Sequence, residues 1–213
     1  SNLHALDADH GLPPSLGGLS ELFAEGQVSV VHGVGYPGAN RSHFRSLEIW
    51  HSADPLQPPH GVGWLGRMAD QVLRAAPGSM PALHVGDEEL PLALMGRSVF
   101  APTVRDEHSL RLAELPALAD ERAHLVAPGA APGDLAFLRG AARSAYAAAE
   151  RMERAIAQPT SSAYPDLGLA AKLRLIAKLV AGGFDTRLFL VTLSGFDTHA
   201  RQAQLHAARL DEL

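Results

Sequence analysis

Short apolar runs alternate along the chain with longer segments in which apolar residues recur at helical spacing. The valine-rich run QVSVVHGVG (residues 27–35) ends in glycines, a pattern that predicts a buried strand. The unbroken apolar run RLFLVTL (residues 187–193) is typical of a strand that is buried on both faces of a parallel sheet. Shorter strands are predicted around Ala82–Val85 and near Ser98–Phe100.

Helical spacing is clear in WLGRMADQVLRAA, where Trp64, Leu65, Met68 and Val72 fall on one face. Gly182-Gly183 ends another predicted helix, because glycine is common just after the last helical turn. The helices predicted in this way cover Leu16–Ala24, residues 40–52, residues 64–76, Asp134–Ala157, Leu167–Ala181 and the final segment LHAARLDEL.

Strands that alternate with helices predict an α/β sandwich, in which helices cover a sheet. Residues 1–213 are expected to form a single domain. The central region, residues 81–132, is poorly periodic, and we interpret it as an insertion or a lid. Any specificity pocket is expected there.

Composition narrows the class of protein. The chain has 213 residues, of which 46% are hydrophobic and 19% charged, as in a globular domain. No apolar run approaches the roughly 20 residues of a membrane span. The net charge of −5 and the scattered basic residues argue against a nucleic-acid surface. The absence of cysteine excludes disulfides, thiolate metal sites and cysteine nucleophiles.

The segment SGFDTHARQ, Ser194–Gln202, follows the apolar run RLFLVTL and precedes a predicted helix. Ligands in open α/β sheets bind outside the carboxyl ends of the strands. Asp197 and His199 can therefore bind one metal ion, through a carboxylate oxygen and an imidazole nitrogen. The alternative is that Asp197 or Thr198 caps the following helix and that His199 is simply solvated.

A second candidate site, GYPGANRSHFRSLEIW, also lies between a predicted strand and a predicted helix. The backbone N–H groups and the dipole at a helix N-terminus stabilise an anion, so Ser42 is a candidate nucleophile for a phosphoryl or sulfuryl group. N-capping by Asn40 or Ser42 explains the same pattern. The residues that would assist Ser42 or bind the anion are Arg41, His43 and Arg45.

Two weaker features remain. His60, in the loop HSADPLQPPHGVG, could act as a ligand or proton donor, although a lone loop histidine is more often solvated. Gly33–Gly38 fits the pattern G-x-G-x-x-G after a predicted strand, but Gly61–Gly66 fits it equally well without one. A nucleotide-binding oxidoreductase is therefore a weak hypothesis.

Two blocks of the sequence together resemble a known family. VVHGVGYPGANRSHFRSLEIWHSADP is similar to the N-proximal block of the family called domain of unknown function 1501. SGFDTHARQ, with the helix and strand before it, is similar to that family's second block. The resemblance spans nearly the whole chain, and the family belongs to the alkaline-phosphatase-like superfamily, with sulfatases and metal-dependent phosphoglycerate mutases.

The resemblance implies a three-layer α/β/α sandwich with a mostly parallel sheet, and metal-assisted hydrolysis of a phosphate or sulfate ester. Asp197 and His199 would be ligands of a divalent metal (Zn²⁺, Mn²⁺, Ca²⁺ or Mg²⁺). Ser42 would lie where relatives place the nucleophile. Members of the family usually carry a twin-arginine export signal, so the resemblance also implies a periplasmic or extracytoplasmic protein. The residues that would bind the small anionic substrate are Arg41, Arg45 and His60.

The family's acidic G-G-x-D-G-L-N-type loop and its D-H-G-type block have no counterpart here. Two matched ligands fall short of the three that a catalytic zinc needs. We therefore interpret the chain as a fragment of an exported metallohydrolase, with an incomplete metal site and exposed sheet edges that favour homo-oligomers. The alternative is a non-catalytic binding or scaffold protein that keeps the fold.

Overall fold

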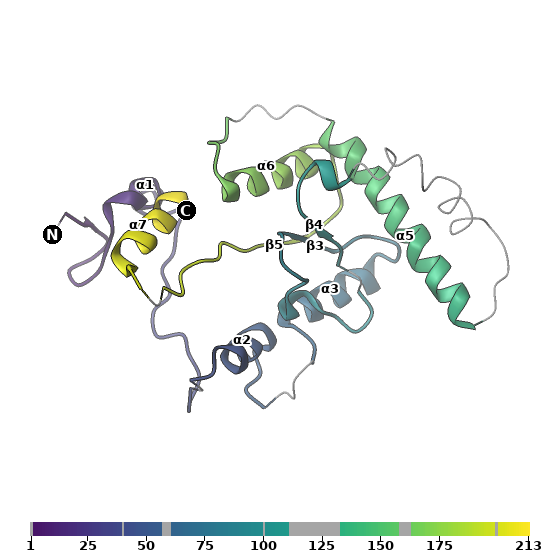
Figure 1. Cartoon of the computed structure of the whole chain (residues 1–213), viewed down its shortest axis with the longest axis horizontal. Helices are drawn as coiled ribbons and strands as arrows, with labels where there is room; N and C mark the ends of the chain where they lie inside the picture. Colours follow the sequence, from purple (N-terminus) through teal and green to yellow (C-terminus); the bar gives the residue numbers. More distant parts are fainter. Residues whose placement is uncertain are drawn as a thin grey trace.

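The computed structural model describes residues 2–39, 41–56, 61–99, 101–110, 133–157, 163–198 and 200–213. A sheet of three parallel strands lies at the centre of the described chain, with helices around it (Figure 1). The strands are β3 (Ala82–Val85), β4 (Thr103–Val104) and β5 (Leu188–Val191), in the order β4-β3-β5. The predicted α/β class is confirmed, and so is the predicted strand at β3.

The central strand β3 pairs on both sides. Val85 is in register with Val104 of β4 and with Val191 of β5. All four residues of β3 are buried. Because the strands are parallel, their carboxyl ends lie at one edge of the sheet.

Alternate side chains of β3 point to opposite faces of the sheet, and all of them are buried. Helices therefore cover both faces. On one face lie α5 (Gly133–Ile156) and α6 (Gly168–Ala181), and on the other lie α3 (Trp64–Ala75) and the short helix η2 (Leu92–Leu94). The core of the first face includes Leu83, Val85, Met152, Leu175 and Leu179. The core of the second face contains Ala69, Ala82, Leu94 and Ala101.

Two glycines let η2 and the residue that follows it pack closely against the start of α3. A Cβ atom at Gly63 would overlap the carbonyl group of Leu92, and one at Gly66 would overlap that of Met95. The Gly63 N–H donates a hydrogen bond to the carbonyl oxygen of Met95 at 2.9 Å. Close packing therefore explains Gly63 and Gly66, two of the three glycines by which Gly61–Gly66 matches the pattern G-x-G-x-x-G.

The buried Asp70 fastens the loop after η2 to α3. Its carboxylate accepts hydrogen bonds from the backbone N–H groups of Arg97, Ser98 and Val99 at 2.8, 2.9 and 2.8 Å. Burial raises the pKa of Asp70, but these three hydrogen bonds and the charge of Arg74 together hold the pKa below its usual value. The carboxylate therefore stays ionised inside the fold.

The two ends of the chain pack together, at the left of Figure 1. The short antiparallel strands β1 (His4–Ala5) and β2 (Gly11–Leu12) lead into η1 (Pro14–Leu16) and α1 (Gly17–Ala24). The last helix, α7 (Gln202–Glu212), contacts η1 and α6. The helices predicted at both ends of the chain are therefore confirmed.

The remaining predicted helices form with small shifts of their ends, and α2 spans His43–Ser52. Residues 81–110, in the region interpreted as an insertion or lid, supply two of the three strands of the sheet. Residues 111–132 lie outside the described residues. None of the described helices is both long and apolar enough to cross a membrane.

The strand predicted at residues 27–35 is wrong. This segment forms no regular structure, and Val31 and Val34 are 76% and 62% exposed. A strand needs a partner that accepts and donates its backbone hydrogen bonds. Within the described residues, the strand pairs are β1 with β2 and β3 with β4 and β5, so the valine run pairs with no strand.

Two further predictions about the sheet need correction. RLFLVTL does contain β5, but the strand is only partly buried, because among the described residues it is an edge strand that pairs only with β3. The third strand is β4, at Thr103–Val104, and does not lie at Ser98–Phe100. The backbone N–H groups of residues 97–99 bond to Asp70 instead, and Phe100 lies outside the described residues.

Candidate functional site at the carboxyl edge of the sheet

Polar side chains gather where the three parallel strands end. Asp87 and Glu88 follow β3, Arg105 follows β4 and Thr192 follows β5. The last residue of β3 is in register with the last residues of both neighbouring strands, so these ends lie level with one another. This edge is where open α/β sheets bind ligands.

The imidazole of His84, in β3, is completely buried beneath this edge. Its Nδ1 lies 3.1 Å from Thr103 Oγ1, and its Nε2 lies 3.5 Å from Glu88 Oε1, beyond an ordinary hydrogen bond. A Cβ atom at Gly86 would lie 2.7 Å from Nε2, so this glycine leaves the ring its space. Burial lowers the pKa of His84 more than the nearby Glu88 carboxylate raises it, and the imidazole is neutral at pH 7.

Charged groups from two neighbouring elements surround the end of β3. The Asp87 carboxylate lies between two cations. Its Oδ1 is 3.2 Å from Nε of Arg105, and its Oδ2 is 3.7 Å from Nζ of Lys172 in α6. Burial raises the pKa of Glu88, but hydrogen bonds from its own backbone N–H and from Thr192, with the charge of Lys172, hold it below its usual value. Glu88 is therefore a carboxylate at neutral pH.

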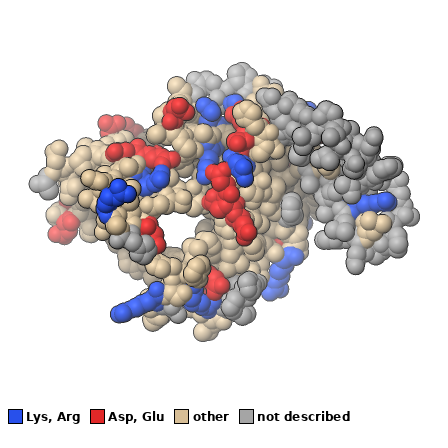
Figure 2. All heavy atoms as spheres, in the orientation of Figure 1, with Lys and Arg blue, Asp and Glu red and all other residues tan. Residues whose placement is uncertain are grey.

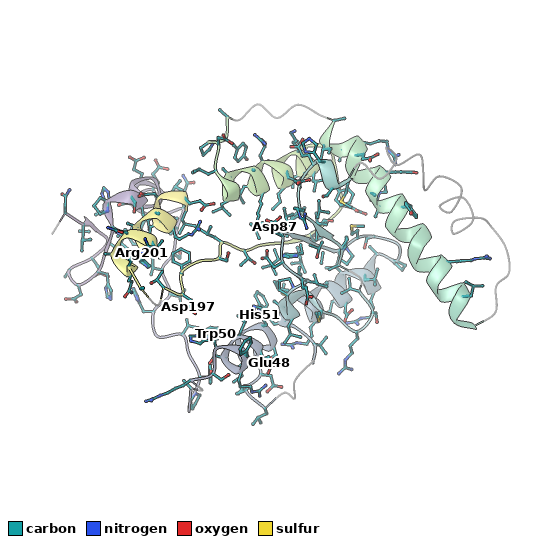
Figure 3. All side chains as sticks on the ribbon, in the orientation of Figure 1. Glu48, Trp50, His51, Asp87, Asp197 and Arg201 are labelled. Carbon is teal, nitrogen blue, oxygen red and sulfur yellow. The ribbon has the colours of Figure 1, made fainter. Side chains whose placement is uncertain are left out.

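An opening in the molecular surface lies beside this edge. Figure 2 shows acidic side chains around it. In the same orientation, Figure 3 places Asp87 on its upper side, Asp197 on its left, and Trp50 and His51 of α2 on its lower side. His51 is half-buried, and burial lowers its pKa. Three segments that are far apart in the sequence therefore border one opening.

Ser42, the candidate nucleophile, is the N-cap of α2. Its Oγ accepts a hydrogen bond from the Arg45 backbone N–H at 3.5 Å, so the capping role is confirmed. Arg41, Ser42 and His43 are exposed. The catalytic role of Ser42 and His43 stays a prediction.

Arg45 is held close to α2. Its guanidinium donates hydrogen bonds to Glu48 Oε2 and to the carbonyl oxygen of Pro55, each at 3.0 Å. An anionic substrate would have to displace these two acceptors in order to bind Arg45. Arg41 is exposed, so a substrate could bind Arg41 without breaking either hydrogen bond. His60, the third candidate for substrate binding, lies outside the described residues.

Asp197, the candidate metal ligand, is exposed in the segment between β5 and α7. The N-cap of α7 is Arg201, which has a left-handed backbone with φ 51° and caps through no side-chain hydrogen bond. The alternative that Asp197 or Thr198 caps this helix is therefore wrong. His199 lies outside the described residues.

Asp87 and Asp197, which border the opening, supply carboxylate oxygens, the ligands that a hard divalent cation prefers. Asp197 precedes His199 by two residues, which adds an imidazole to the set. Among the described residues, however, no set of three potential ligands that includes Asp197 comes within 4.8 Å of one another. A complete site would need His199 or a closer approach across the opening.

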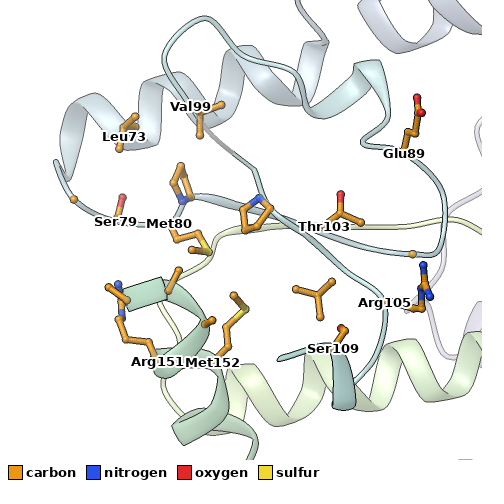
Figure 4. Close-up of a pocket in the computed structure, with 18 of the residues that line it drawn as sticks. Leu73, Ser79, Met80, Glu89, Val99, Thr103, Arg105, Ser109, Arg151 and Met152 are labelled. Atoms are coloured by element: carbon orange, nitrogen blue, oxygen red, sulfur yellow. The ribbon is translucent and has the colours of Figure 1, made fainter. Parts of the chain in front are cut away.

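A cleft of about 1080 Å³ adjoins the same edge (Figure 4). Arg105 and Glu89 lie at one end, and Ser79 and Arg151 lie at the other. Most of its lining residues fall within 81–109, in the first part of the region where a specificity pocket was expected. Its lining includes the apolar side chains of Leu73, Met80, Val99, Val104 and Met152.

Sequence reasoning missed the residues at the end of β3, which are His84, Asp87 and Glu88. One signal was present, because the run of three acidic residues in HVGDEEL follows a predicted strand in the same way as Asp197 does. His51 had no comparable signal, since its place beside the opening depends on how α2 packs.

Comparison of the chain with protein-family models, with curated proteins and with solved structures gives no match. The case for a function therefore depends on the geometry of this edge and on the family resemblance of the two sequence blocks described above.

Proposed function

We propose that the chain is a metal-dependent hydrolase of phosphate or sulfate esters, with an alkaline-phosphatase-like fold, and that its site is the opening at the carboxyl edge of the sheet. One observation carries this proposal. Acidic residues that follow two neighbouring parallel strands, Asp87 after β3 and Asp197 after β5, border the same opening. The family resemblance of the two sequence blocks, which include Ser42 and Asp197, supports the choice of reaction.

In this proposal Asp197 and His199, with Asp87 across the opening, would hold the ion. The ion would polarise the ester and lower the pKa of the attacking group. Ser42 supplies the nucleophilic oxygen at the N-terminus of α2, where backbone N–H groups stabilise negative charge. Arg41, exposed beside it, binds the anionic group of the substrate, because an arginine side chain can make two parallel hydrogen bonds to phosphate or sulfate.

The test is an assay with aryl phosphates and aryl sulfates in the presence of Zn²⁺, Mn²⁺, Ca²⁺ or Mg²⁺. Asp197→Asn should reduce metal-dependent kcat/KM by about 100-fold, and Ser42→Ala by at least as much. Asp185→Asn is the matched control, because Asp185 is exposed at the opposite end of β5 and pairs with Arg151 at 2.7 Å. The control should keep the activity of the unmodified chain.

Equal activity in Asp197→Asn, Ser42→Ala and Asp185→Asn would remove these residues from the mechanism. No activity with any ester, and the same metal-induced thermal shift in the unmodified chain and in Asp197→Asn, would favour a binding or scaffold protein instead. Export to the periplasm and association through exposed apolar surface belong to the same proposal. Cell fractionation and sedimentation analysis would test them.

A further inference from the structure

Three metal-ligating side chains meet on the surface near the N-terminus, on elements separate from the carboxyl edge of the sheet. Asp7, His10 and His32 each offer one ligand atom, and these atoms all lie within 4.8 Å of one another. All three side chains are exposed. Within the part of the chain that the structure describes, no other group of three histidine or acidic side chains is so close.

Asp7 and His10 are already held in place by the turn between β1 and β2. Asp7 Oδ1 accepts hydrogen bonds from the backbone N–H groups of Asp9 and His10, each at 2.8 Å. His10 Nδ1 lies 2.9 Å from Asp7 Oδ1 and 3.0 Å from Oδ2. The hydrogen bond from the Asp9 backbone N–H, followed by the one from the His10 side chain, lowers the pKa of Asp7, so the carboxylate is ionised at neutral pH.

His32 comes from residues 27–35, the valine-rich segment that forms no strand. Its ring stacks on the ring of His10, with centroids 4.2 Å apart and an angle of 29° between the planes. The contact joins two segments that lie 22 positions apart in the sequence. Two imidazoles beside a carboxylate form a donor set that suits a borderline divalent ion such as Zn²⁺ better than Ca²⁺ or Mg²⁺.

The spacing fits such an ion after small side-chain rotations. Zinc bonds of about 2.0–2.1 Å place tetrahedral ligand atoms roughly 3.3 Å apart. The separation of Asp7 and His10 is already close to this, and His32 has to move its ligand atom by no more than about an ångström and a half. An exposed histidine makes this adjustment by rotation about its side-chain bonds.

We propose that Asp7, His10 and His32 form a binding site for a divalent transition-metal ion, and that the bound ion fastens residues 27–35 to the β1–β2 turn. Three protein ligands leave one position to water in a tetrahedral site. The site is independent of the proposed hydrolase activity.

The test is a titration of the chain with Zn²⁺ at pH 7.5, followed by calorimetry and by the NMR signals of the histidine rings. Asp197→Asn serves as the background, so that the proposed carboxyl-edge site does not contribute. His32→Gln and His10→Gln should each weaken binding by at least about tenfold. His206→Gln, at an exposed histidine on α7, is the matched control and should bind Zn²⁺ as the background does.

Zn²⁺ should also slow proteolysis within residues 27–35 in the background chain and leave it unchanged in His32→Gln. Circular dichroism confirms that each variant is folded. Identical Zn²⁺ titrations of the background and His32→Gln would overturn the proposal. So would ring signals of His10 and His32 that stay unmoved while those of other histidines shift.

Discussion

The strand β3 and residues 27–35 are both short apolar runs followed by or ending in glycine. Only β3 forms a buried strand, whereas residues 27–35 form no regular structure. Every residue of β3 is buried, whereas Val31 and Val34 are largely exposed. β3 has a parallel strand on each side and helices over both faces. The difference teaches that an apolar run becomes a strand only where other segments accept its hydrogen bonds and cover its side chains.

The largest contrast is expected from removal of apolar side chains in the two regions. Leu83→Ala in β3 should lower the free energy of unfolding by about 3 kcal/mol, because it empties space between β3 and the helices α5 and α6. Val31→Ala should change it by less than about 0.5 kcal/mol, since the side chain is exposed. Urea denaturation measures both, and similar losses would show that residues 27–35 are packed in solution.

A second contrast concerns two aspartates that each bind backbone N–H groups, Asp70 inside the fold and Asp7 on the surface. Asp70→Asn should cost about 2 kcal/mol, because the amide NH₂ faces a backbone N–H that has lost its acceptor. The pKa of Asp70 is lowered on folding, so its stabilisation is full above the unfolded pKa of about 3.9 and is lost as the pH falls through the folded value.

Urea denaturation of Asp70→Asn at several pH values should therefore show a smaller loss of stability toward acid than the unmodified chain. Asp7→Asn is the control. Hydrogen bonds also lower the pKa of Asp7, but solvent screens its exposed carboxylate, so this substitution should change the pH dependence less than Asp70→Asn does. An Asp70→Asn variant with the unmodified pH dependence would show that folding does not lower the pKa of Asp70.

The helices could be predicted from the sequence, because a helix makes its backbone hydrogen bonds within itself and its signals are local. The apolar face of α3 and the N-cap Ser42 of α2 are examples. Strands depend on partners that are remote in the chain. The pattern therefore located β3 and β5 correctly, placed β4 wrongly, and predicted a strand at residues 27–35 that has no partner.

Part of the candidate site could be predicted for a similar reason. Asp197 follows an apolar run, and its place beyond the carboxyl end of β5 follows from that order alone. The neighbours of Asp197 depend on the strand order β4-β3-β5, which the sequence does not reveal. Asp87 and Glu88 reach the site only because β3 lies beside β5, and His51 only because α2 packs nearby.

The smallest contrast compares the buried His84 with the exposed His32. His84→Leu should change stability at pH 8 by less than about 1.5 kcal/mol, since the two side chains have similar volumes. Burial lowers the pKa of His84, so the unmodified chain keeps its full stability above the unfolded pKa of about 6.5 and loses stability as the pH falls below it.

His84→Leu removes this loss, and its stability should fall less steeply than that of the unmodified chain as the pH drops from 6.5 toward 5. His51, whose pKa burial also lowers, contributes the remaining slope in that range. His32→Leu, measured with a chelator present, is the control for loss of an imidazole from the surface. A steeper fall in His84→Leu would mean that the protonated ring is stabilised by Glu88, 3.5 Å away, more than burial penalises it.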